Sequence, residues 1–147
     1  MPNIELLNTF LKDELSATET YQQALDNLKG DAELGQSESL TPIYVEHKEA
    51  VSSLQALINR LGGTPAEDSG VWGTWTHIVI GGAKFLGKKA TLKALQEGEK
   101  NGAEGYEKAL LDTELPNDIR SLIETKLLVS KHANILTLER LLDTEAA

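Results

Sequence analysis

The sequence reads ELSATETYQQAL from Glu14 to Leu25 and EKNGAEGYEKAL from Glu99 to Leu110. The two stretches share a leading glutamate, a tyrosine seven residues later and a closing Ala-Leu, at an offset of 85 residues (99 − 14). Self-similarity at a fixed offset marks a supersecondary unit that is used more than once. The chain is therefore expected to contain one helical hairpin twice.

Helical periodicity surrounds both stretches, because apolar residues recur there at steps of three and four. Together with capping and stop signals, this pattern predicts helices at about residues 3–29, 42–61, 89–111 and 116–142. The second helix is expected to begin with Thr41 as its N-cap and Pro42 in its first turn. Residues 62–88 form a long crossover between two short connections. The sequence thus predicts an all-α antiparallel four-helix bundle, a single domain over residues 1–147.

Composition narrows the range of partners and compartments. The chain has 147 residues, 40% of them hydrophobic, which is enough for one compact core. Its 14 basic and 23 acidic side chains give a net charge of −9, which disfavours nucleic acid and anionic membranes as partners. There is no cysteine, so thiolate ligands and disulfides are excluded. No signal-peptide pattern and no membrane-length apolar run is visible, so a cytoplasmic location is expected.

Four residues with metal-ligand chemistry fall on the apolar sides of the expected helices: Glu14, His47, Glu99 and His132. The two histidines are again 85 residues apart (132 − 47). An ionised carboxylate in a protein interior costs several kcal/mol unless a cation compensates it. If the two hairpins meet around a pseudo-twofold axis, the four side chains could hold one divalent ion such as Zn, Fe or Mn.

A repeated tyrosine also bears on this hypothesis. Tyr21 and Tyr106 lie seven residues beyond each glutamate, on the same helix face and about 10 Å along the axis, where they could cover the site or reach it through water.

The alternative is that each Glu–His pair shares a proton and no metal is bound. In that case the chain is a non-catalytic structural or interaction bundle.

Several segments resemble the ferritin-like superfamily, in particular small bacterial four-helix proteins that are grouped as a domain of unknown function. The matching segments span about residues 4 to 142 and are Asp-Glu14-Leu-Ser-Ala, Leu61-Gly62-Gly63-Thr-Pro65, Leu-Gln-Glu-Gly-Glu99 and Ser-Lys-His132-Ala. The resemblance implies a ferritin-like bundle, a divalent transition metal and a redox or stress-related role. Since ferritin-like domains often assemble, it also suggests a homo-oligomer.

The chain departs from the family pattern at the positions that bridge two metal ions. Ferritin-like di-iron sites use Glu-x-x-His on two of the four helices. Here the residue three before His132 is Val129, and the residue three before His47 is Tyr44. An alternative register places His47 at the Glu position and Ala50 at the His position, which also leaves the motif incomplete. One metal ion or none is therefore expected, and a di-iron oxidase is the last-ranked reading.

Overall fold

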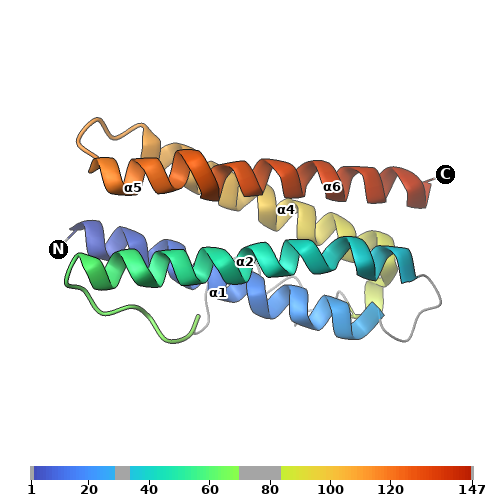
Figure 1. Ribbon diagram of the computed structural model, residues 1–147. Coiled ribbons are helices and arrows are strands. Elements are labelled where there is room, and N and C mark those ends of the chain that lie inside the picture. The colour runs from blue at the N-terminus through green and yellow to red at the C-terminus, as the bar shows by residue number, and fades with distance from the viewer. Residues whose placement is uncertain (1, 29–33, 70–83, 147) are drawn as a thin grey trace. The chain divides into compact units, whose positions relative to one another are not determined.

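The computed structural model describes residues 2–28, 34–69 and 84–146 (Figure 1). The chain divides into two compact units, Met1–Phe85 and Leu86–Ala147. All regular structure in the described ranges is helical. Each unit is a pair of helices, and the units are described one at a time.

The first unit consists of α1 (Pro2–Leu28) and α2 (Leu34–Arg60), which pack against each other. The pair is antiparallel, because the chain leaving α2 returns to the start of α1. Asn8 donates a hydrogen bond from Nδ2 to the carbonyl oxygen of Thr64 (3.1 Å) and accepts one from the backbone N–H of Ala66 (2.8 Å). The core of this unit includes Leu7, Phe10, Leu11, Ala17, Leu54, Leu57 and Ile58.

The expected start of the second helix at Thr41–Pro42 is wrong. Helix α2 begins at Leu34, and Pro42 lies inside it. A proline in a helix interior costs roughly 3 kcal/mol, since it removes one hydrogen bond and crowds the preceding turn. The longer helix buries Leu40 and Ile43, and burying such a side chain contributes about 1.5–3 kcal/mol. Burial of apolar side chains around the proline therefore offsets much of its cost.

The second unit consists of α4 (Lys84–Leu110) from Leu86 onward, α5 (Asn117–Leu122), the π-helical turn η2 (Ile123–Leu127) and α6 (Leu128–Ala146). The segments α5, η2 and α6 follow one another without a break in helical backbone conformation. Arg120 in α5 donates from Nη1 to the carbonyl oxygen of Leu110 (3.1 Å) at the end of α4. This contact places the start of the last helix beside the end of α4, so this pair is antiparallel too.

The π-helical turn decides which side of the last helix faces inward. Its buried residues advance mostly in steps of four: Ile119, Ile123, Leu127, Lys131, Asn134 and Leu138. In a regular α-helix such steps would drift by about 40° each around the axis. A wider π turn absorbs that drift. The prediction that His132 faces the core is therefore wrong, because Lys131 is 1% exposed whereas the His132 side chain is 57% exposed.

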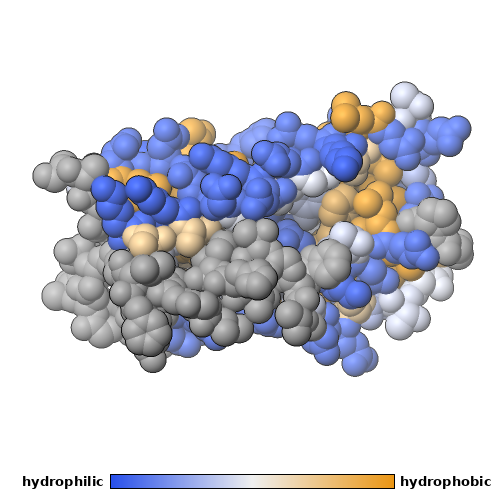
Figure 2. Space-filling view, turned by 180° about the vertical axis from the view of Figure 1, so that it is seen from behind, coloured by the Kyte–Doolittle hydropathy of each residue, from blue (hydrophilic) through white to orange (hydrophobic). Residues whose placement is uncertain are grey.

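Polar residues cover most of the described surface on the face drawn in Figure 2, in keeping with the net charge of −9. The large hydrophobic side chains that are exposed among the described residues are Val45, Leu111, Val129 and Leu136. In the ranges that the structure describes, no helix combines the length and the apolar character needed to cross a membrane.

Candidate functional site

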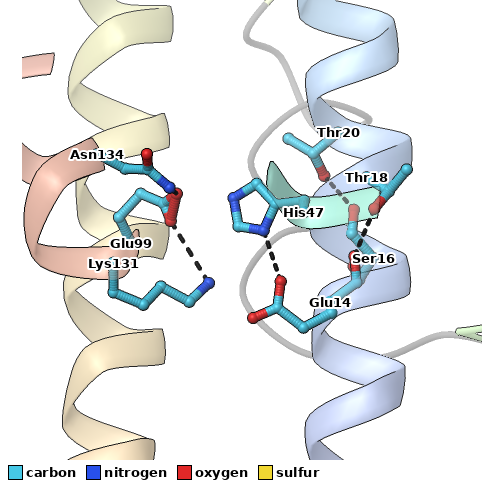
Figure 3. A network of polar contacts seen from close by, with 8 residues as sticks. All are labelled: Glu14, Ser16, Thr18, Thr20, His47, Glu99, Lys131 and Asn134. Carbon is cyan, nitrogen blue, oxygen red and sulfur yellow. Dashed lines mark hydrogen bonds and ion pairs between the residues drawn. The ribbon is translucent and has the colours of Figure 1, made fainter. Parts of the chain in front are cut away.

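The first unit contains a buried carboxylate–imidazole pair (Figure 3). Glu14 in α1 and His47 in α2 are 1% and 2% exposed, and the distance from Oε2 of Glu14 to Nδ1 of His47 is 2.5 Å. A side-chain hydrogen bond between two buried groups therefore joins α1 to α2. Glu14 and His47, which the sequence analysis named as candidate ligands, are thus in contact inside the α1–α2 hairpin.

The surroundings of this pair are partly aromatic and partly polar. The ring of Tyr21 stacks on the ring of His47, with centroids 5.0 Å apart and an interplanar angle of 29°. Thr18 donates its hydroxyl to the backbone oxygen of Glu14 (2.8 Å), so this hydroxyl is satisfied within its own helix. Tyr21, which the sequence analysis placed near the site, thus lies directly against the imidazole.

The second unit contains a buried carboxylate with a different set of partners (Figure 3). Glu99 in α4 is fully buried; its Oε1 accepts a hydrogen bond from Nδ2 of Asn134 (2.9 Å). Its Oε2 lies 3.4 Å from Nζ of Lys131, which forms a buried ion pair. Both partners come from α6 and are themselves buried. The network therefore joins the two helices of this unit through a carboxylate, an amide and an ammonium group.

Two residues of α4, Gly102 and Tyr106, face the lysine side chain. A Cβ atom built on Gly102 would lie 2.8 Å from Cε and 2.9 Å from Nζ of Lys131, so a larger residue here would require the end of the lysine side chain to shift. The ammonium also lies over the ring of Tyr106, 6.0 Å from its centroid, within the range of a cation–π interaction. The facing helix α4 thus provides space for the lysine side chain at Gly102 and an aromatic face for its ammonium group at Tyr106.

The two hairpins repeat one arrangement with different chemistry. In each, a buried glutamate of the first helix meets a side-chain nitrogen of the second, 33 residues later at His47 and 32 residues later at Lys131. The sequence repeat located Glu14, Glu99 and His47, but it pointed to His132 where the structure has Lys131. Sequence reasoning also missed Asn134, although Lys131 and Asn134 have the spacing of three that places two side chains on one helix face.

His132 lies on the surface of α6. Its Nε2 is 3.9 Å from Oε1 of Glu107, and both side chains are more than half exposed. Exposed pairs of this kind contribute roughly 0–1 kcal/mol. Val129, three residues earlier, is exposed too. The inward pair with a spacing of three on this helix is Lys131 and Asn134, and not Val129 and His132 as the sequence analysis assumed.

These residues define an all-helical protein with a buried carboxylate in each of its two helical hairpins. The chain belongs to the family described as "Domain of unknown function (DUF2383)", whose sequence model matches residues 3–112. It is similar to a solved structure described as ferritin-like, diiron-carboxylate proteins from Bacillus anthracis str. Ames, with 20% sequence identity and a TM-score of 0.74. That match covers 96% of this chain and 95% of the other. Among curated proteins, no match was found.

The comparisons confirm the predicted fold class, an all-α ferritin-like helical bundle. Most of the crossover predicted at residues 62–88 lies outside the described residues. The side chains of the second unit do not fit the ligand set of a paired-metal centre. Its inward positions with Glu-x-x-His spacing hold Lys131 and Asn134, and an ammonium is no metal ligand. Within the described ranges, no group of three or more His, Asp or Glu side chains is placed to hold a metal ion.

Proposed function

We propose that this chain is a ferritin-like bundle whose core works without a metal centre, and that it serves as a structural or interaction protein and not as a di-iron oxidase. One observation carries the proposal: the buried Glu99 carboxylate is already held by the ammonium of Lys131 and the amide of Asn134. The charge compensation that a metal ion would give this carboxylate is supplied by the chain itself.

An ammonium and a metal ion would compete for the same carboxylate. Two unit charges about 4 Å apart interact with roughly 4 kcal/mol at an effective dielectric constant near 20, and a divalent ion doubles that value. A metal ion on Glu99 would therefore be repelled by Lys131 unless the lysine moved away. Because Lys131 is buried beside Gly102 and Tyr106, such a movement would also empty the space that its side chain fills.

Metal content and thermal stability test this proposal together. We expect protein that was purified without chelator to contain well under one Zn, Mn or Fe per chain by elemental analysis. We also expect dialysis against chelator, followed by addition of Zn²⁺, Mn²⁺ or Fe²⁺, to leave the melting temperature unchanged. A ligand at a hundredfold excess over its dissociation constant adds roughly 2.7 kcal/mol of stability. A clear metal-dependent rise in melting temperature would contradict the proposal.

A second candidate is a protein that binds one divalent ion, Zn, Fe or Mn. The buried pair of Glu14 and His47 favours it, since a carboxylate and an imidazole are ordinary ligands of these metals. The ligand set named from the sequence, Glu14, His47, Glu99 and His132, does not carry this candidate, because His132 lies on the surface of α6. If metal does raise the melting temperature, Glu14→Gln and His47→Gln should abolish the rise, and Glu49→Gln on the exposed side of α2 should leave it intact.

The location and assembly of the protein also stay predictions. A cytoplasmic location and a homo-oligomer are proposed from the composition and from the ferritin-like fold. Size-exclusion chromatography with light scattering measures the mass in solution directly. A mass of 16.0 kDa, that of one chain, would contradict the proposed homo-oligomer.

A further inference from the structure

We propose that the polar core of the α4–α6 unit is a cation site occupied by the chain's own Lys131, and that it accepts a primary alkylammonium ion once the lysine side chain is removed. The inference rests on the proposed function, because it takes Lys131 as the resident cation. It goes further in naming the chemical class that the site recognises. That class is an ammonium group on a short alkyl chain.

The charged end of this site is defined by three groups. Glu99 supplies the negative charge, and Asn134 fixes the carboxylate through its hydrogen bond to Oε1. The other carboxylate oxygen, Oε2, then lies 3.4 Å from the ammonium nitrogen. The ring of Tyr106 lies 6.0 Å from that nitrogen and stabilises a positive charge over its face. All four side chains are buried, so the ion pair is little screened by solvent.

The alkyl part of the site is defined by Gly102. This glycine lies one helical turn after Glu99, on the same face of α4. A Cβ atom at Gly102 would lie 2.8 Å from Cε and 3.4 Å from Cδ of Lys131. The missing side chain therefore leaves space along the methylene groups as well as at the nitrogen. A bare metal ion could replace the charge but would not fill this space.

Lys131→Ala removes the atoms Cγ, Cδ, Cε and Nζ, and n-propylammonium contains the same three carbons and one nitrogen. The variant keeps the carboxylate of Glu99 but loses its cation and leaves a cavity. Breaking a buried pair on one side is strongly destabilising, and we expect the melting temperature to fall by about 10 °C. n-Propylammonium chloride should restore a substantial part of that loss, because it returns both the charge and the volume.

The experiment measures thermal melting of wild type and Lys131→Ala at constant ionic strength over a titration of n-propylammonium chloride. Propan-1-ol has nearly the same size without the charge, and ammonium chloride has the charge without the chain. We expect the amine alone to raise the melting temperature of Lys131→Ala by several degrees and to leave wild type unchanged. An equal response of the two proteins, or equal rescue by propan-1-ol, would overturn the inference.

Two further variants locate the effect. Lys131→Ala combined with Glu99→Gln should lose the response to the amine, since the charge that attracts it is gone. Lys131→Met fills the alkyl space with an uncharged chain and should not respond. If either of these responds as strongly as Lys131→Ala, the amine binds elsewhere and the inference fails.

The inference remains testable if Lys131→Ala does not fold. In the Lys131→Met background, adding Glu99→Leu should raise the melting temperature, because it removes a carboxylate that has lost its cation. If it lowers the melting temperature as much as Glu99→Leu does in wild type, Lys131 is not the cation of this site. The proposed function fails separately, through metal bound to the wild-type protein, so the two failures can be told apart.

Discussion

Gly102 lies directly against the side chain of Lys131: a methyl group on its Cα would be 2.8 Å from Cε and 2.9 Å from Nζ. A glycine in the middle of a helix normally costs roughly 0.5–1 kcal/mol relative to alanine. Its presence in α4 is explained by the room that it leaves for the lysine. Gly102 thus leaves room for the end of the lysine side chain in the position where it pairs with Glu99.

The first prediction compares two glycines of α4. Gly102→Ala should lower the free energy of unfolding by about 1–2 kcal/mol, because the new methyl group pushes the ammonium away from Glu99. Gly105→Ala should raise it by about 0.4–1 kcal/mol, since a Cβ there meets nothing within 4 Å. Urea denaturation measures both values. Equal stabilisation by the two substitutions would show that Lys131 does not need this space.

The second prediction concerns the coupling between Glu99 and Lys131. Each of the substitutions Glu99→Leu and Lys131→Met should cost roughly 3–5 kcal/mol, because each leaves one charge of a buried pair behind. The double variant should be much more stable than the sum of the two losses implies. A double-mutant cycle in urea gives the coupling energy, which we expect to be about 2 kcal/mol or more. Additive losses would mean that the two groups are not coupled.

The third prediction concerns the pair in the first unit. Glu14→Leu should lower the free energy of unfolding by about 2–4 kcal/mol, since it leaves the buried imidazole of His47 without its carboxylate. The matched control is Glu49→Gln, which changes an exposed carboxylate on α2 and should cost less than about 0.5 kcal/mol. If the two substitutions have the same small effect, the Glu14–His47 contact does not stabilise this hairpin.

The fourth prediction compares the effects on stability of replacing His132 and its neighbour Lys131. His132→Ala should change the free energy of unfolding by less than about 0.5 kcal/mol, because its only described ion pair, with Glu107, is exposed on both sides. Lys131→Ala, one residue earlier, should be far more harmful. A large loss of stability on His132→Ala would indicate that this histidine is buried. That result would contradict its exposed position on α6.

The fifth prediction concerns the proline inside α2. Pro42→Ala should raise the free energy of unfolding by about 1–3 kcal/mol, because it restores a backbone N–H donor and relieves crowding within the helix. Pro42 is exposed, so no packing is lost. Thermal melting and urea denaturation both report the change. A loss of stability would indicate that α2 begins at Pro42 after all, as the sequence analysis expected.

The fold could be predicted from the sequence because the repeat and the helical periodicity are properties of the chain alone. The repeated glutamates, Glu14 and Glu99, were located for the same reason: a carboxylate on an apolar stripe stands out. His47 followed from regular periodicity in α2. All of these residues could be predicted by assuming regular α-helical geometry.

The second half of the site could not be predicted in this way. A π-helical turn at Ile123–Leu127 changes which residues of the last helix face inward, so that Lys131 and not His132 is buried. The residue types in that turn do not indicate a π-helix. Regular α-helical spacing therefore selected His132, which also fitted the repeat, in place of Lys131. A lysine on an apolar stripe is usually assumed to extend to the surface. Its burial depends on Gly102 and Asn134, whose roles become visible only when α4 and α6 are placed together.

The central claim is that Lys131 supplies the cation of a core that works without metal. Crystals of the wild-type protein soaked in Zn²⁺ and measured at the zinc absorption edge test it most directly. The account predicts no anomalous peak at zinc–oxygen distance, about 2.0–2.2 Å, from the carboxylate of Glu99, with Lys131 still paired to it. A zinc peak at that carboxylate, with the lysine side chain displaced, would contradict the account.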